Sequence, residues 1–140
     1  MKPTITPEAY KKKLDVLDLK DIALTYASFK LKKEQLSESL SVDIDETHSF
    51  RQKEDRLFVQ YKYDFHAFGH NTKEPAIVLK AHYTVEYSVG GGVIIKKDFM
   101  EIFTDVTVSI ILWPYFREFV NNAIQRMGLP SLVLGLKKRN

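Results

Sequence analysis

The sequence contains no cysteine, and this absence removes several classes of protein at once. A chain without cysteine forms no disulfides, has no thiol nucleophile, and cannot ligate zinc or an iron–sulfur cluster through sulfur. Its 140 residues fit a single domain, residues 1–140, whose stability has to come from packing. The composition therefore favours an intracellular globular protein over a small secreted scaffold.

Long apolar runs are also missing. The longest, residues 108–113, is interrupted by Ser109 and is far shorter than the roughly 18 to 20 residues of a membrane span. Residues 1–7 include a lysine but no apolar core and no small-residue cleavage site, so a secretory signal is not expected. We expect a cytoplasmic protein without a membrane span.

An excess of one charge is absent too, because 21 Lys and Arg face 18 Asp and Glu to give a net charge of +3. The basic clusters at 11–13, 96–97 and 137–139 are short, and acidic residues lie among nearly all of them. Such clusters are typical of solvated surface, and the βαββαβ order of a four-stranded RNA-binding sheet is not found. We therefore expect no nucleic-acid partner.

No pattern for metal, nucleotide or catalytic chemistry is present. His66 and His70 are four residues apart, which on a strand separates them by about 13 Å, too far for one ion. The glycines at 90–92 precede β-branched residues instead of the Gly-Lys-Ser/Thr of a phosphate loop. Carboxylates are scattered without an identifiable acid and base pair. We expect no enzymatic activity, no metal site and no cofactor.

The periodicity predicts a short helix followed by four strands. Thr6 as N-cap and Pro7 at the first helical position predict a helix over residues 7–18. Alternating apolar residues then predict strands over 21–32, 39–51, 57–67 and 77–87. One face of the last two strands is polar, carrying Gln60, Lys62, Asp64, His66, Lys80, His82, Thr84 and Glu86. This pattern indicates an antiparallel sheet with one polar and one apolar face.

Helical spacing replaces alternation after the glycines, from about residue 97 to 127. Two adjacent apolar stripes give this helix a wide apolar arc, while Pro114 must begin the regular helix or kink it. Gly128 and Pro130 end the helix, and residues 131–136 are expected to form a short extended tail. The predicted fold class is α+β, a four-stranded antiparallel sheet followed by a long helix, with a short extra helix at the N-terminus.

The wide arc predicts self-association, because a thin sheet and one helix have a single inner layer to fill. We expect a homodimer or a homotetramer, a dimer of dimers, with the helix at 105–127 in an interface. The expected interface residues are Val108, Leu112, Phe119, Val120, Ala123, Ile124 and Met127.

The predicted helix contains a motif of defined spacing. The chain has Trp113-Pro114-Tyr115-Phe116-Arg117-Glu118 followed by Gly128-Leu129-Pro130-Ser131-Leu132-Val133-Leu134. This motif resembles the SecB export-chaperone family, which carries an aromatic-Pro-Tyr-x-Arg-Glu segment, then Gly, an apolar residue, Pro and a Leu-x-Leu tail. The similarity covers roughly residues 20–136 and is motif-like over 112–134. The family's order of four antiparallel strands, a glycine-containing connection and a long helix matches the elements predicted above.

The resemblance implies a non-catalytic chaperone that binds unfolded polypeptide in an apolar groove, with a role in protein export. The peptide-binding residues it implies are Val93, Ile94, Phe99, Phe103, Trp113, Tyr115 and Phe116. The alternative is a dedicated partner-binding or structural protein of the same fold, for example one associated with a toxin–antitoxin system, without general chaperone activity.

Three departures from the export members bear on this choice. Those members continue into a further C-terminal helix and tail, they are acidic, and their usual pattern lacks the N-terminal helix. They use carboxylates on the sheet to engage the translocase motor SecA, whereas here Lys62, Lys80 and two histidines share the polar face. SecA binding is therefore doubtful.

Overall fold

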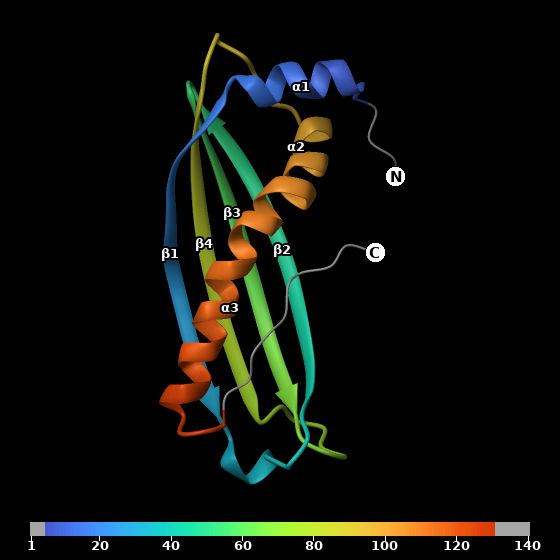
Figure 1. The fold of residues 1–140 in the computed structure, drawn as a ribbon, viewed down its shortest axis with the longest axis vertical. Helices are drawn as coiled ribbons and strands as arrows, with labels where there is room; N and C mark the ends of the chain where they lie inside the picture. Colours follow the sequence, from blue (N-terminus) through green and yellow to red (C-terminus); the bar gives the residue numbers. More distant parts are fainter. Residues whose placement is uncertain (1–4, 131–140) are drawn as a thin grey trace.

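A computed structural model describes residues 5–130. One antiparallel sheet contains the strands β1 (Leu17–Leu31), β2 (Ser41–Lys53), β3 (Arg56–Phe68) and β4 (Ile77–Val89). A continuous helical segment of α2 (Lys97–Phe103), η2 (Thr104–Val108) and α3 (Ser109–Arg126) crosses one face of the sheet (Figure 1). The short helix α1 (Pro7–Asp15) precedes β1. The predicted α+β architecture is confirmed, and the tail predicted at 131–136 lies outside the described residues.

The N-terminal helix begins where the sequence predicts. The Thr6 Oγ1 accepts a hydrogen bond from the Ala9 amide at 3.2 Å, which satisfies one of the free donors of the first turn. The helix ends at Asp15 instead of residue 18, because Leu17 already pairs with Val89 in the ladder between β1 and β4. The Tyr10 ring stacks on Phe99 with centroids 4.9 Å apart, so α1 packs on the start of α2.

The strands lie in the order β1, β4, β3, β2. Two hairpins link β2 to β3 and β3 to β4, and the chain between β1 and β2 crosses the end of the sheet through the short 3-10 helix η1 (Lys33–Gln35). The first strand is therefore an edge strand that pairs with the last one. Sequence alternation gave no information on this order, because it identifies the buried face of a strand and not the neighbour.

Pro114 lies inside α3, so it neither begins the helix nor coincides with the irregular turn. That turn is the π-helical segment η2, which precedes α3. At the junction, the Ser109 hydroxyl donates to the Asp105 carbonyl at 2.5 Å.

The segment from Lys97 to Arg126 is long and apolar enough to cross a membrane by length and composition alone, with 44% of its most apolar window buried. The core helix of a soluble protein meets the same criterion.

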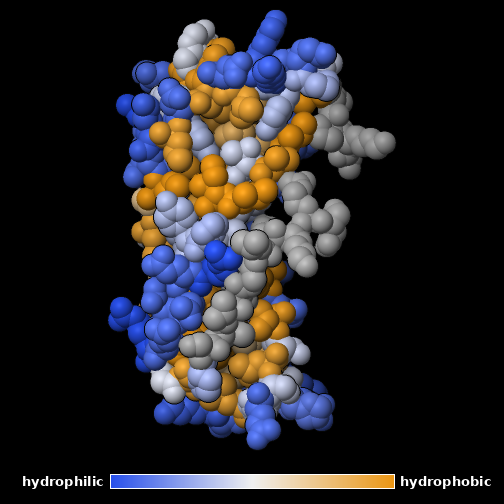
Figure 2. All heavy atoms as spheres, in the orientation of Figure 1, coloured by the Kyte–Doolittle hydropathy of each residue, from blue (hydrophilic) through white to orange (hydrophobic). Residues whose placement is uncertain are grey.

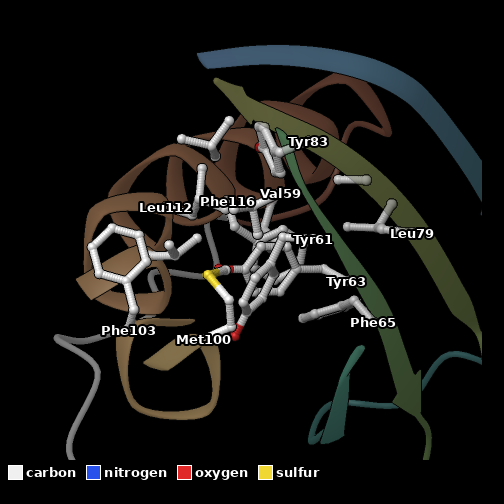
Figure 3. Close-up of a cluster of buried hydrophobic side chains, with 14 of the residues drawn as sticks. Val59, Tyr61, Tyr63, Phe65, Leu79, Tyr83, Met100, Phe103, Leu112 and Phe116 are labelled. Atoms are coloured by element: carbon white, nitrogen blue, oxygen red, sulfur yellow. The ribbon is translucent and has the colours of Figure 1, made fainter. Parts of the chain in front are cut away.

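The core lies between the helix and the apolar face of the sheet, called here the inner face. The side chains of β3 and β4 that point to the helix are almost fully buried, and their neighbours along each strand form the polar outer face that the alternation predicted. Tyr63 stacks on Phe116 with centroids 4.1 Å apart and planes within 7° (Figure 3). Burial raises the pKa of Tyr87 to about 12, so the ring stays neutral in this core.

Candidate peptide-binding site

A hollow opens between the inner face of β2 and the start of the long helix. The rings of the helix pack on β3, β4 and β1, as in the pairs Tyr63–Phe116 and Phe29–Phe119. The inner face of β2 consequently stays half-buried, and His48 is exposed. The hollow has a volume of about 340 Å3 and is lined by His48, Ser49, Phe50, Lys97, Met100, Glu101 and Thr104. We call it the β2 hollow; Figure 2 shows apolar surface over α2 and η2 beside it.

A hydrogen-bonded pair of side chains lies on the inner face next to this hollow. The Tyr61 hydroxyl donates to Glu46 Oε1 at 2.6 Å, and His48 stacks on the Tyr61 ring at 5.8 Å. Burial, followed by the bond to Glu46, raises the pKa of Tyr61 far above its usual value. The raised pKa keeps the Tyr61 phenol protonated, so the phenol donates to Glu46 as a fixed polar contact.

The aromatic wall continues from the hollow toward α3. Trp113 is half-buried, with its ring 6.3 Å from Tyr63 and 5.9 Å from Phe116. The Tyr63 hydroxyl is buried without a hydrogen-bond partner, and burial raises the Tyr63 pKa. An unpaired buried hydroxyl costs free energy, which the packing of the Tyr63 ring has to offset.

The loop after β4 is held in place by one side chain of β2. Gln52 Nε2 donates to the Val93 carbonyl at 2.9 Å, and Gln52 Oε1 accepts from the Ile95 amide at 2.7 Å. The turn itself uses Gly91 and Gly92 at φ +66° and +63°, values that favour glycine. The two hydrogen bonds from Gln52 hold the loop so that Ile94 points outward, where 66% of its surface is exposed.

A second hollow, of about 340 Å3, lies at the other end of the helix. It is lined by the crossover between β1 and β2 and by the end of α3: Leu36, Ser37, Glu38, Leu40, Ile77, Ile124, Leu129 and Pro130. We call it the crossover hollow. Both hollows are open and are lined largely by apolar side chains with a few polar groups, as ligand pockets in general are.

The structure divides the predicted peptide-binding residues into buried and accessible ones. Phe99, Phe103 and Phe116 are at most 1% exposed and belong to the core, which corrects their assignment to a binding surface. Aromatic rings of α1, β4 and β3 cover these three side chains. The four others have free surface: Val93 and Trp113 are half-buried, and Ile94 and Tyr115 are exposed. None of the seven lines either hollow.

The predicted interface residues are mostly core residues as well. Val108, Leu112, Val120, Ala123 and Ile124 are at most 2% exposed within one chain. They have no surface left for a second copy, because the inner face of the sheet already covers them. Phe119 and Met127 are half-buried and keep some surface for an interface.

No pattern in the sequence distinguishes the residues that line the two hollows from other residues of their strands and helices. His48 and Phe50 follow the ordinary alternation of a half-buried strand, and Met100 and Glu101 follow ordinary helical spacing. The β2 hollow exists because the helix does not cover the inner face of β2. The position of the helix depends on packing between elements that are remote in sequence. No group of three His, Asp or Glu side chains within residues 5–130 could hold a metal ion.

Apolar side chains are also exposed on the opposite side of the helix. Leu24 and Phe29 of β1 are 47% and 55% exposed, and Tyr115 of α3 is 48% exposed. Phe29 stacks on Phe119 at 5.5 Å, and Tyr115 meets Tyr83, the ladder partner of Leu24, at 6.5 Å. We call this surface of Leu24, Phe29, Tyr115 and Phe119 the β1/α3 patch.

Comparison with known proteins identifies the fold. No protein-family model matches the chain, and no curated protein matches its sequence. Among solved structures, the SecB-like chaperone Rv1957 of Mycobacterium tuberculosis, in complex with a ChAD peptide from the antitoxin HigA1 (Rv1956), matches with a TM-score of 0.78. The match covers 94% of this chain and 98% of that chain at 16% identity. The chain has the SecB-like fold.

The resemblance found in the sequence is thereby confirmed at the level of the fold. A protein of unknown function from Streptococcus agalactiae matches with a TM-score of 0.43 at 8% identity, covering 86% of this chain and 97% of that one.

Proposed function

We propose that the protein is a SecB-like molecular chaperone that binds unfolded or partner polypeptides in its apolar hollows, without enzymatic activity. The observation that carries this proposal is the shared fold over 94% of the chain with a chaperone solved with a peptide bound. The hollows supply the required surface, because an extended polypeptide is held by apolar pockets and backbone contacts. The SecB-like fold and the cysteine-free composition support a cytoplasmic location.

The test is suppression of aggregation of several unrelated denatured proteins, followed by light scattering. Phe50→Asp in the β2 hollow and Leu40→Asp in the crossover hollow place a charge where a client side chain would bind. We expect each to raise the concentration needed for half-protection about tenfold, the effect of losing about 1.4 kcal/mol of binding. Ile110→Asp is the matched control, since Ile110 is 47% exposed and lines neither hollow. Failure of the unaltered protein to protect any client or partner would refute the proposal.

A dedicated binder of one partner is the second candidate function. The peptide in the matched structure comes from an antitoxin, which favours a single partner of that kind over a range of clients. The same assay separates the two functions, because a general chaperone protects many clients and a dedicated binder protects its partner alone. Protein export is the less supported role, since the sheet face that would meet SecA is of mixed charge.

Self-association through the β1/α3 patch completes the proposal. Three large side chains about half exposed, Leu24, Phe29 and Tyr115, lie together there, and a second copy of the same patch would remove them from water. Burial of apolar surface contributes about 25 cal/mol per Å2 before association costs. Leu24→Lys with Phe29→Lys should lower the mass in multi-angle light scattering while the far-ultraviolet circular dichroism stays unchanged. A monomeric unaltered protein at micromolar concentration would contradict this contact.

A further inference from the structure

We propose that residues 131–136 of the chain itself bind in the crossover hollow and along the first half of β2, so that a client has to displace them. These residues follow the last described residue, Pro130. The effect on clients rests on the proposed function, whereas the binding of the segment does not. Three observations support the proposal: where the chain leaves α3, the pattern of apolar residues, and the distribution of charge.

The end of α3 leads the chain into the wall of the crossover hollow. The amide of Gly128, at φ +75°, donates to the Gln125 carbonyl at 3.0 Å, and the Leu129 amide donates to the Ile124 carbonyl at 3.3 Å. This pair of bonds is a Schellman motif, which ends the helix. Leu129 packs against the core and lines the hollow together with Pro130. The residues that follow Pro130 therefore start beside the hollow.

An apolar surface continues from the hollow onto β2. Ile77 and Ile124, at most 2% exposed, are the most deeply buried lining residues, and Leu36 and Leu40 are half-buried. The next inner-face residues along β2, at positions 42 and 44, are a valine and an isoleucine that are also half-buried. The surface open to a ligand thus extends from the hollow of about 340 Å3 along the first half of β2.

The sequence of residues 131–136 matches this surface in its spacing. It reads Ser-Leu-Val-Leu-Gly-Leu, with leucines at positions 132, 134 and 136. In an extended segment, residues two apart share one face, so the three leucines would point the same way. The surface repeats this spacing with Leu40, Val42 and Ile44. An extended polypeptide is recognised in this manner, through pockets for alternate side chains.

Charge is complementary between the same two stretches. Residues 137–139 are Lys-Lys-Arg, whereas residues 34–50 contain no Lys or Arg and carry the acidic residues Glu34, Glu38, Asp43, Asp45 and Glu46. Lys137 is seven residues beyond Pro130, a reach of about 23 Å at roughly 3.3 Å per residue. Glu46 is six residues beyond Leu40, or about 20 Å along the strand. A segment that follows β2 from the hollow therefore brings its basic end next to the acidic residues.

Covalent attachment favours this segment over a client in solution. A site and a ligand joined by a short link meet at an effective concentration in the millimolar range. The affinity measured for a client is then reduced by the fraction of molecules in which the hollow is open. We expect release of the segment to strengthen client binding about tenfold.

Paired substitutions in the full chain test the competition. Leu132→Asp with Leu134→Asp, called here the leucine pair, places charges on the face proposed to bind. The concentration needed for half-protection in the aggregation assay should then fall about tenfold. Val133→Asp with Gly135→Asp adds the same charge on the opposite face of an extended segment and should leave that concentration unchanged. No effect of the leucine pair, or an equal effect of both pairs, would overturn the competition.

A fluorescent peptide with the sequence of residues 131–140 tests the binding without any client. In fluorescence anisotropy it should bind the leucine-pair protein at least about tenfold more tightly than the unaltered protein, whose hollow is already occupied. Adding Leu40→Asp should weaken this binding about tenfold, whereas adding Ile110→Asp, at a 47% exposed position outside the hollow, should not. A peptide with glutamates at 137–139 should bind more weakly. Equal binding to both proteins, or none to the leucine-pair protein, would overturn the binding of the segment.

The two assays keep this inference apart from the proposed function. If no protein protects any client but the peptide binds as expected, the function is refuted and the binding of the segment stands. If the unaltered protein protects clients but the peptide does not bind, the function stands and the inference is refuted. An effect of the leucine pair that grows with protein concentration would assign the hollow to the segment of a second copy and overturn binding within one chain.

Discussion

Three neighbouring aromatic residues within α3 lie in three different environments. Trp113 is half-buried against Tyr63 of β3, Tyr115 belongs to the β1/α3 patch, and Phe116 is in the core. Each residue of a helix is rotated by about 100° from the previous one, so neighbours in one motif need not share a surface. The motif that identifies the fold is thus partly a packing motif, and only Trp113 and Tyr115 keep surface for a ligand or a second copy.

Phe116→Ala should lower the free energy of unfolding by about 3 to 5 kcal/mol, because it removes a fully buried ring stacked on Tyr63 and leaves a cavity. Urea denaturation followed by tryptophan fluorescence measures the change. Tyr115→Ala, at an exposed position on the same helix, is the matched control and should cost much less. A similar loss for both variants would show that Phe116 is not a core residue.

His82 should titrate below the ordinary histidine pKa of about 6.5. Burial first, and then Lys62 across the ladder, lower the pKa of this imidazole, against an opposing contribution from Asp64. Because the unfolded chain binds the proton more tightly, the contribution of His82 to stability is complete above about pH 6.5 and is lost as the pH falls toward the native pKa. NMR titration of the imidazole protons measures this, and Lys62→Gln should raise the midpoint. A midpoint of 6.5 or higher in the unaltered protein would contradict the assignment.

At the scale of elements, the crossover between β1 and β2 is fixed by close backbone contact. A Cβ atom added to Gly69, just after β3, would lie 2.2 Å from the carbonyl oxygen of Gln35 in η1. The adjacent His70 amide donates to the Ser37 hydroxyl at 2.8 Å. These contacts hold the crossover against the end of the sheet and shape one wall of the crossover hollow.

Gly69→Ala should therefore lower the free energy of unfolding by about 1 to 3 kcal/mol, because a backbone oxygen cannot move aside as a flexible side chain can. Thermal unfolding followed by circular dichroism measures the effect. Gly90→Ala is the matched control, since the nearest atom to its added Cβ is 3.7 Å away. An equal effect of the two substitutions would refute the tight crossover contact.

At the scale of the molecule, the charges on the outer face of the sheet do not produce an electrostatic field of a single sign. Arg56 binds Glu86 at 2.5 Å, and Lys80 lies 4.0 Å from Asp64, so opposite charges compensate each other across β3 and β4. Long-range steering of a charged partner needs a continuous patch of one sign. The mixed charges of β3 and β4 do not form such a patch.

Titration calorimetry with a cognate SecA should accordingly show weak or no binding. Without complementary charge, association loses its steering and much of its specificity. Replacement of Lys62 and Lys80 by glutamate should strengthen any residual signal at low salt. A micromolar or tighter, salt-sensitive dissociation constant for the unaltered protein would contradict this expectation and restore export as the main role.

The sequence alone determined the elements and their faces. Capping at Thr6, alternation along four strands and helical spacing after the glycines are local properties. Each helix and strand predicted within residues 5–130 is found. Only the tertiary structure decided the strand order and which aromatic residues remain accessible. A period of two or 3.6 residues states that a face is buried but not what covers it. The helix covers β3 and β4 and leaves β2 partly bare, and this placement turned predicted interface residues such as Leu112 into core and created a hollow beside His48.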